Sequence, residues 1–309
     1  MIKFYKRQDS LIYPYYFKIK NFPKLLFPKL YIKKYYKNSF GQFPDLINPK
    51  MYSEKLQVLK FDYAKNNTVI LAGDKVGMRE YVSSCGLDHL LVPIVGTFDS
   101  LKQIDWESLP NSFVMKKSNA SGQMFTVKDK SKVNRNEIYK QMKIWMKIDF
   151  GQNMIEPHYR KMKSRIIIEE FLSGISEDWR IFYFSGEPKF VQIDKWIEPS
   201  NEKIIGHKRR IRVWTDTKGK ILEVLADKEA VNVPYKSGMS IELPADFEKM
   251  IENGNILSKD FPLVRIDYFH SNNKLYLGEL TFTPGSGYQV LTPKMQKDLG
   301  KFLKLPGKR

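Results

Sequence analysis

Residues 263–287 have the sequence LVRIDYFHSNNKLYLGELTFTPGSG, in which two strand patterns are followed by a loop of small residues. The patterns predict strands over 263–269 and 275–281 that pair as a hairpin. Asp267 lies on the first strand and Glu279 on the second. Two carboxylates that face each other from adjacent strands repel unless a cation lies between them. Such oxygen ligands suit Mg²⁺, which binds through one or two carboxylates together with phosphates and water.

The same hairpin also allows a purely structural explanation. Strand alternation places Arg265 on the same face as Asp267, so an arginine–aspartate pair is the alternative to a metal site. After Glu279 the chain leaves strand geometry through Thr283-Pro-Gly-Ser-Gly287. Hydroxyls and free amides in such a loop suit an oxyanion or an acyl phosphate. An ordinary turn can have the same composition, and the residues alone leave both interpretations open.

A second motif combines a lysine with a loop of small residues. Strands predicted over 113–117 and 124–127 flank this loop, and Lys116 lies near the end of the first strand. A lysine on a strand can meet a phosphate as a point charge. Small residues around Ser121 and Gly122 let backbone N–H groups approach phosphates closely. Alone this motif is weak, since a lysine in a hairpin is usually solvated.

A third motif is the apolar strand at 165–171, which ends in Glu169 and Glu170. An extended backbone next to carboxylates can hydrogen-bond a purine edge, and a later acid, Glu177 or Asp178, can accept from ribose hydroxyls. The structural alternative is an edge strand with an acidic end.

The order of elements indicates an α+β fold, because antiparallel hairpins alternate with single helices from residue 113 onward. A serine cap at Ser53, an aspartate cap at Asp74 and Thr292-Pro293 predict three helix starts. We expect another helix from about Asn134. Neither a GxGxxG motif nor a P-loop occurs in the sequence.

The N-terminal 40 residues form a basic, aromatic arm. They hold ten Lys and Arg, one acid and twelve aromatic residues, within a chain of 309 residues and net charge +18. Prolines at 14, 23 and 28 exclude one long helix. An anionic membrane surface and simple packing on the protein body explain this pattern equally well. A single-stranded nucleic acid also fits in principle, but no nucleic-acid motif occurs elsewhere, so we expect no such partner.

Composition excludes several protein classes. No segment approaches the about 20 apolar residues of a membrane-spanning helix, and the N-terminus shows no secretory pattern. The one cysteine, Cys85, excludes an internal disulfide framework and a thiolate metal cluster. We therefore expect a cytoplasmic protein, either soluble or attached peripherally to the inner face of the membrane.

Read in chain order, the motifs resemble the ATP-grasp superfamily and, more narrowly, its TupA-like family, named for teichuronopeptide biosynthesis. The resemblance runs from about Asn48 to Thr292, and its most specific block is Gly278–Gly287. It implies an ATP-grasp fold, with two α/β lobes that clasp a nucleotide between antiparallel sheets. The domain organisation that follows is an arm over 1–45, an N-terminal lobe over 46–112, and nucleotide-binding and catalytic lobes over 113–309.

The resemblance also implies residue roles. The cofactors are ATP and Mg²⁺. Thr281 occupies the position where the superfamily usually has a third metal ligand, an asparagine. The implied nucleotide-binding residues are Lys116 at the α-phosphate, Ser121 and Gly122 in the phosphate loop, Glu169, Glu170 and Leu172 at the adenine, and Glu177 or Asp178 at the ribose. The implied metal residues are Asp267, Glu279 and Thr281.

The implied reaction is ligation of a carboxylate to an amine through an acyl phosphate, with ADP as product. Arg180 screens the charge of the phosphates, Arg265 orients the acyl phosphate, and Arg212 is a candidate to hold an acidic acceptor. The resemblance implies that an amino acid or another amine is attached to an acidic saccharide of a surface or capsular polysaccharide, or to its lipid-linked precursor. The alternatives are a glycosyltransferase-like protein of the same pathway and a non-catalytic, basic scaffold that binds glycan or membrane.

Overall fold

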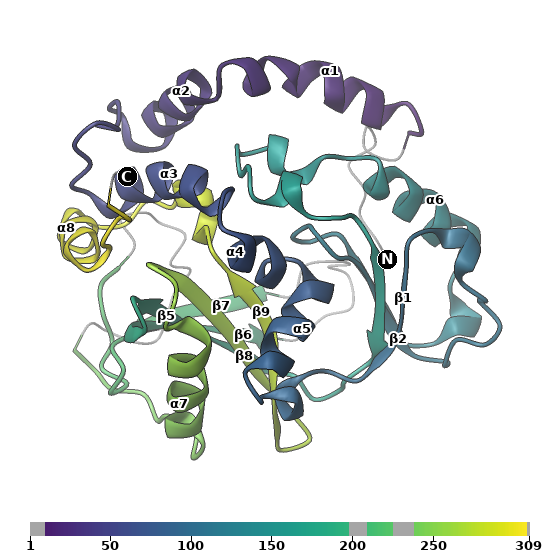
Figure 1. Ribbon diagram of the computed structural model, residues 1–309. Helices are drawn as coiled ribbons and strands as arrows, with labels where there is room; N and C mark the ends of the chain where they lie inside the picture. Colours follow the sequence, from purple (N-terminus) through teal and green to yellow (C-terminus); the bar gives the residue numbers. More distant parts are fainter. Residues whose placement is uncertain (1–9, 198–208, 225–237, 308–309) are drawn as a thin grey trace.

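The protein is described by a computed structural model, which covers residues 10–197, 209–224 and 238–307 (Figure 1). Residues 1–9 of the expected arm lie outside the described residues. The strands form two separate antiparallel sheets, one of four strands and one of five. Helices surround both sheets, as expected for an α+β fold.

The four-stranded sheet has the order β1–β4–β2–β3. Alternate residues of β2, Phe113 and Met115, point into a core beneath α6, where Ile138 and Met142 meet them. Asn134 caps α6, because its side chain accepts hydrogen bonds from two backbone amides of the first turn. The elements are β1 (Ile94–Phe98), β2 (Phe113–Lys117), β3 (Met124–Val127), β4 (Ile166–Glu170) and α6 (Arg135–Met146).

The five-stranded sheet has the order β7–β6–β5–β8–β9. Two tight turns, Ser185-Gly186 and Asn272-Asn273, connect its hairpins, and all four turn residues have positive φ angles between 50° and 83°. This backbone geometry matches the right-handed twist of paired strands. The strands are β5 (Glu177–Phe184), β6 (Glu187–Ile197), β7 (Arg209–Thr215), β8 (Val264–Ser271) and β9 (Lys274–Thr281).

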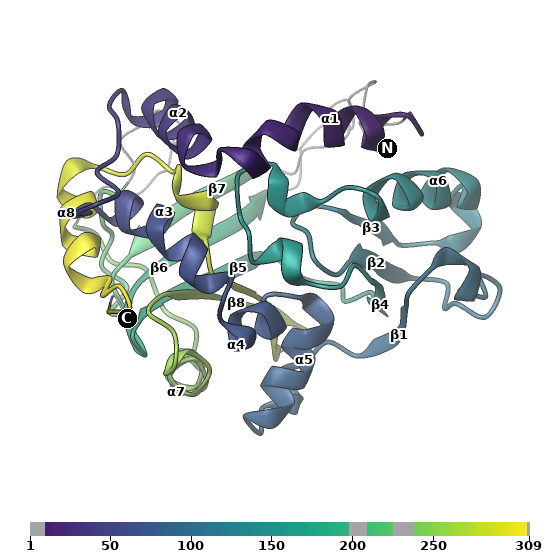
Figure 2. The same ribbon diagram turned by 45° about the horizontal axis from the view of Figure 1, so that its top comes forward.

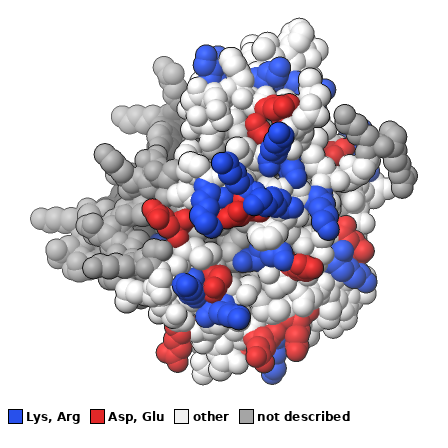
Figure 3. All heavy atoms as spheres, turned by 90° about the vertical axis from the view of Figure 1, so that its left-hand side faces the viewer, with Lys and Arg blue, Asp and Glu red and all other residues white. Residues whose placement is uncertain are grey.

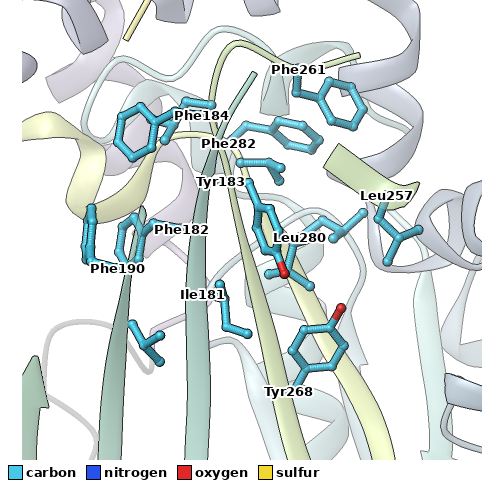
Figure 4. Packing of buried hydrophobic residues seen from close by; sticks show 14 of the residues in the cluster. Ile181, Phe182, Tyr183, Phe184, Phe190, Leu257, Phe261, Tyr268, Leu280 and Phe282 are labelled. Carbon is cyan, nitrogen blue, oxygen red and sulfur yellow. The ribbon is translucent and has the colours of Figure 1, made fainter. Parts of the chain in front are cut away.

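The main hydrophobic core lies on this larger sheet (Figure 4). Phe182 stacks on Phe190 with ring centroids 4.2 Å apart. Helix α7 (Phe247–Ser258) packs against β5 so closely that a Cβ at Gly254 would lie 1.9 Å from the Tyr183 hydroxyl oxygen. Only glycine leaves room for this contact, which fixes the distance between the helix and the sheet.

Helices near the chain ends pack on one another beside the larger sheet. Asp74 caps α5 and Thr292 caps α8, with Pro293 as the first residue of α8, as the sequence predicts. The expected cap of α3 at Ser53 is wrong. Its first helical residue is Tyr52, and the Glu54 carboxylate accepts hydrogen bonds from two backbone amides before the helix at 3.0 Å. The helices are α3 (Tyr52–Tyr63), α4 (Asn67–Ala72), α5 (Lys75–Ser84) and α8 (Pro293–Phe302).

The described part of the arm forms two helices, α1 (Tyr13–Leu26) and α2 (Pro28–Phe40), which lie across the top of the molecule in Figure 1 and along one side of both sheets (Figures 1 and 2). Phe17 of α1 packs on Ile144 and Ile148, whereas α2 contacts α3 through a hydrogen bond of 2.8 Å between the Tyr36 and Ser53 hydroxyls. None of the described helices is both long and apolar enough to cross a bilayer. The domain boundaries at residues 45 and 112 remain predictions.

Candidate active site

One face of the five-stranded sheet carries a layer of charged and polar side chains. Asp267 of β8 lies opposite Glu279 of β9 on one side and opposite Arg180 of β5 on the other. Two residues earlier on β8, Arg265 lies opposite Thr281. Because strand residues two positions apart share a face, these five side chains belong to one layer.

Arg265 holds Asp267 through both carboxylate oxygens. Its Nε donates to Oδ1 at 2.6 Å, and its Nη2 donates to Oδ2 at 2.7 Å. The same Nη2 donates to Thr281 Oγ1 at 3.0 Å. Arg180 adds a third cationic contact, because its Nε lies 3.3 Å from Asp267 Oδ2. Of the two explanations that the residues left open, the arginine–aspartate pair is therefore present in the structure.

Asp194 of β6 links the remaining arginines of this layer. Its side chain is fully buried and lies 2.9 Å from Arg180 Nη1, and it accepts hydrogen bonds at 2.7 Å and 2.9 Å from Arg212. Arg180 also donates to Asp178 at 3.1 Å. Asp194 is not among the site residues expected from the sequence. The available signal was an acid two residues after Gln192, which places both side chains on the same face of the predicted strand.

Burial changes the pKa values of two acids in this layer. Desolvation raises the pKa of Asp267 above its ordinary value, although Arg265 and Arg180 lower it in part. Desolvation likewise raises the pKa of Asp178, and Arg180 again acts in the opposite direction. The arginines thus offset part of the desolvation cost of the two charged carboxylates, which would otherwise favour their protonation. A bound cation would act in the same sense.

The four-stranded sheet contributes a smaller group of charges. Lys116 Nζ of β2 lies 2.5 Å from Glu169 Oε2 of β4, the neighbouring strand. Arg79 of α5 lies 3.8 Å from the other carboxylate oxygen of Glu169. The structure thus brings together the predicted phosphate lysine and one predicted adenine residue. Glu170 is exposed, and its backbone amide donates to Pro93 O at 3.0 Å.

The remaining predicted nucleotide residues follow β4 along the chain. Leu172 is half-buried in the extended segment between β4 and β5. At the start of β5, Glu177 accepts from Trp179 Nε1 at 3.1 Å and lies 3.2 Å from Lys195 Nζ. Glu177 and Asp178 therefore already have polar partners. A ribose hydroxyl would have to compete with these partners.

The predicted phosphate loop has an exposed tip at Ser121 and Gly122. Gly122 has φ +72°, a conformation that favours glycine. Lys75 Nζ donates to the carbonyl of Ala120 at 2.6 Å and so ties the loop to the first turn of α5. The loop is therefore anchored on one side by a residue that the sequence analysis did not place in the site.

Helix α5 connects the charges of the two sheets. Lys75 and Arg79 are one turn apart and thus lie on the same helix face. Lys75 Nζ is 3.9 Å from Glu279 Oε1 of the larger sheet, while Arg79 contacts Glu169 of the smaller sheet. Two cations on one helix therefore join the predicted metal carboxylate to the predicted adenine and phosphate residues. Only the arrangement of elements that are distant in the sequence reveals this link.

The loop after β9 has an unusual backbone. Gly285, Ser286 and Gly287 have consecutive positive φ angles of 56°, 51° and 69° within the short helix η6 (Pro284–Gly287). Gln57 of α3 holds this loop, because its Nε2 donates to Ser286 O at 3.2 Å and to Gly287 O at 3.0 Å. Thr283 Oγ1 donates to Glu156 Oε1 at 2.5 Å. The surrounding side chains thus impose the strained conformation.

A buried lysine supports the same loop from below. Lys60 Nζ donates to Gln57 Oε1 at 2.8 Å and to Met154 O at 3.1 Å, and it lies 4.4 Å from the Tyr288 ring centroid. Burial lowers the pKa of Lys60 to about 7, while the nearby Glu156 acts to raise it. Lys60 therefore positions Gln57 and, through it, the loop.

The chemistry of the layer fits Mg²⁺ at Glu279 and Asp267, although no group of three or more acidic, histidine or cysteine side chains with the geometry of a metal site occurs among the described residues. The Glu279 side chain is 26% exposed, and its nearest cation is 3.9 Å away, so its oxygens are accessible. Asp267 would have to release one oxygen from Arg265. Mg²⁺ needs only one or two carboxylates when phosphates and water complete its shell.

Comparison with protein families gives one match, TupA-like ATPgrasp, over residues 54–304. Among proteins with curated descriptions, none matches the chain. The matching solved structures include D-alanine–D-alanine ligase from Bacillus anthracis, with 14% identity, TM-score 0.44, and coverage of 76% of this chain and 67% of that chain. The enzyme from Helicobacter pylori has 17% identity, TM-score 0.39 and coverage of 76% and 62%. VanG D-Ala:D-Ser ligase from Enterococcus faecalis has 14% identity, TM-score 0.44 and coverage of 76% and 62%.

This chain spans about two thirds of the length of those ligases. Because the TM-scores of these structures are below 0.5, the assignment of the chain to a family rests on the family match alone. That match covers the two sheets, α3 to α8 and the whole charged layer, and these elements have the arrangement that the ATP-grasp resemblance implied. The chain belongs to the TupA-like ATP-grasp family.

Proposed function

We propose that the protein is an ATP-dependent ligase that joins a carboxylate to an amine. The observation that carries this proposal is the position of Glu279. It lies directly opposite Asp267 on the neighbouring strand of the larger sheet. It also lies 3.9 Å from Lys75 of α5, the helix that contacts the smaller sheet as well. Membership of the ATP-grasp family supports ATP as the nucleotide.

The proposed reaction has two steps. The substrate carboxylate attacks the γ-phosphorus of ATP, the bond to the β–γ bridging oxygen breaks, and ADP leaves. The amine then attacks the carbonyl carbon of the acyl phosphate, a C–N bond forms, inorganic phosphate leaves, and the proton of the amine passes to solvent. Phosphoryl transfer needs positioning and charge stabilisation more than acids or bases. A layer rich in arginine supports this requirement.

Residues of the smaller sheet, together with the start of β5, bind the nucleotide in this proposal. Lys116 exchanges its contact with Glu169 for the α-phosphate, which a lysine does readily because its ammonium is a point charge on a flexible stem. Ser121 and Gly122 present backbone amides to the phosphates. The adenine contacts are Glu169, Glu170 and Leu172, and the ribose contacts are Glu177 or Asp178.

The residues of the larger sheet act on the reacting groups. Asp267, Glu279 and Thr281 would hold Mg²⁺, which when bound neutralises phosphate charge and polarises the phosphoryl oxygens. Arg180 screens the phosphates, and Arg265 orients the acyl phosphate together with the loop at Thr283–Gly287. Gln57 and Lys60 are positioning residues in this scheme.

The proposed substrates are an acidic saccharide and an amino acid or another amine, as part of surface or capsular polysaccharide biosynthesis. The resemblance to the TupA-like family and the net charge of +18 support an acidic acceptor. Arg212 is the proposed contact for its carboxylate, in exchange for Asp194. A lipid-linked acceptor is presented at the inner face of the membrane, where a cytoplasmic ligase meets ATP.

The test is a screen for ADP release by the purified protein, with amino acids as amines and uronic acids as carboxylates. We expect ADP and phosphate only when MgATP, a carboxylate and an amine are present together. Consumption of a nucleotide sugar without ATP would instead support a glycosyltransferase. If no nucleotide shifts the thermal unfolding midpoint, the protein is a non-catalytic scaffold and the proposal is wrong.

A further inference from the structure

The outward face of α1 is a stripe of large apolar side chains. Ile12 and Ile19 are 73% and 76% exposed, which is unusual for isoleucine in a folded protein. The stripe continues through residues spaced three or four apart, so all of them lie on one side of the helix. Its members are Ile12, Tyr15, Tyr16, Ile19, Phe22 and Leu26.

The opposite face of α1 holds the helix on the protein. Phe17 packs on Ile144 and Ile148, and the buried Lys24 donates to Asn153 O at 2.6 Å. The helix therefore does not need its apolar stripe for attachment. The buried residues Phe17 and Lys24 lie on the side of α1 that faces the protein, and the exposed stripe lies on the opposite side of the helix. Helix α1 itself runs across the top of Figure 1. Six exposed apolar or aromatic side chains on one side of a helix that is already anchored indicate an interaction site.

Positive charge borders the apolar stripe. Lys18 and Lys20 are exposed on α1. The sequence of α1 and α2 holds seven lysines and no acid, whereas basic and acidic side chains lie next to one another on the face seen in Figure 3. Lysine stems can lie along apolar surface while their ammonium groups reach outward. The exposed lysines of α2 are Lys29, Lys33, Lys34 and Lys37.

The chemistry of the stripe selects one occupant. A second copy of the chain would bring the same lysines against these, and like charges would repel. Bases of a nucleic acid stack on aromatic rings, but Ile12, Ile19 and Leu26 offer none. A bilayer with anionic headgroups accommodates both the apolar stripe and the lysines that border it. The aliphatic and aromatic side chains enter the acyl boundary, while the lysines remain among the phosphates.

We propose that the outer face of α1 and α2 docks the protein on an anionic lipid bilayer, with α1 lying in the plane of the membrane surface. Helix α1 is attached to the smaller sheet through α6, and α2 is attached to α3 beside the larger sheet. Docking therefore orients both sheets relative to the bilayer. This inference does not rest on the ligase proposal, because no residue of the stripe belongs to the charged layer.

The experiment is sedimentation of the full-length protein with vesicles of phosphatidylcholine alone or of phosphatidylcholine mixed with phosphatidylglycerol. We expect binding to the mixed vesicles that weakens as salt rises. Replacing Lys18 or Lys20 by Gln should lower the partition coefficient about fivefold each. The triple variant Ile19→Ser, Phe22→Ser, Leu26→Ser should abolish binding. Ile256→Ser removes an exposed isoleucine from α7 (43% exposed) and should bind like the wild type.

Several outcomes would overturn the inference. Failure of the wild-type protein to bind either kind of vesicle would overturn it. This test needs no variant, so it does not depend on whether the triple variant folds. The triple variant could bind normally, with a circular dichroism spectrum like that of the wild type. The wild-type protein could fail to bind vesicles and instead form a dimer in light scattering. If the triple variant abolished that dimer, the stripe would be an interface between copies of the chain. ADP release measured without vesicles tests the ligase proposal separately.

Discussion

The two sheets hold their charges in different ways. The smaller sheet has one short contact, between Lys116 and Glu169, above a strand whose first three residues are fully buried isoleucines. The larger sheet has a continuous network in which each arginine contacts at least one aspartate. Its members are Arg180, Arg212, Arg265, Asp178, Asp194 and Asp267.

In the proposed function, this difference suits two separate tasks. Arginine has a planar fork that fixes a carboxylate in one orientation, whereas lysine can change partners by rotating its stem. The larger sheet therefore holds its groups ready in place, as stabilisation of a reacting phosphoryl group requires. In the proposed function, Lys116 of the smaller sheet exchanges Glu169 for a nucleotide phosphate. Substitutions in the two sheets should accordingly change different measurements.

The largest effect is expected for Glu279→Gln in the larger sheet. Loss of the proposed metal carboxylate should lower the rate of ADP release about 10³-fold or more. The unfolding midpoint should stay close to that of the wild type, because the side chain is partly exposed and its ion pair with Lys75 spans 3.9 Å. Glu187→Gln is the control, since Glu187 lies in the same sheet with a 71% exposed side chain. Near-normal turnover in Glu279→Gln would refute the metal assignment.

A large loss of stability is expected for Asp194→Asn. Removing one partner of a buried ion pair should lower the free energy of unfolding by about 3 kcal/mol, because Arg180 and Arg212 lose their shared carboxylate. Urea denaturation measures this change. Asp298→Asn breaks a surface pair with Lys294 and should leave the midpoint nearly unchanged. Equal losses in the two variants would show that the network of the larger sheet is not held as described.

Adjacent lysines of β2 offer a sharper contrast. Lys116→Met should lower kcat/KM for ATP about thirtyfold, through loss of a charged contact. It should also cost some stability, because the buried Glu169 keeps only Arg79, at 3.8 Å, as a cationic neighbour. Lys117 instead points into the protein, where its Nζ donates to the carbonyls of Trp145 and Ile148 at 3.0 Å and 2.6 Å. Lys117→Met should therefore cost about 2 kcal/mol of unfolding free energy and leave KM for ATP unchanged. The opposite pattern would reverse the roles of the two lysines.

The smallest effect concerns Lys60, whose pKa burial lowers to about 7 in the folded protein from 10.5. Between these values the unfolded chain binds more protons, so the free energy of unfolding rises with pH. Relative to Lys60→Met, the wild type should gain about 1 kcal/mol between pH 7 and pH 8. Chemical denaturation at both pH values measures the difference. A difference that stays constant with pH would mean that Lys60 keeps an ordinary pKa.

Much of the local structure follows from the sequence alone. Strand alternation and turn residues predict the hairpin that places Asp267 opposite Glu279, since pairing across a short turn is a local property. The helix caps at Asp74 and Thr292 depend on the residues next to them and agree with the structure. The Ser53 cap fails because Glu54 supplies the same hydrogen-bond acceptors from inside the first turn.

Contacts between distant elements depend on packing. Lys75 and Arg79 have the pattern of any basic helix face, and only the position of α5 brings them to acids of both sheets. Asp194 meets Arg180 because β5 and β6 pair in one register, and a shift by one residue would turn its side chain to the other face. Lys60 is buried because α3 lies over the loop after β9. The period of a sequence determines which side chains share a face, whereas tertiary packing determines what that face meets.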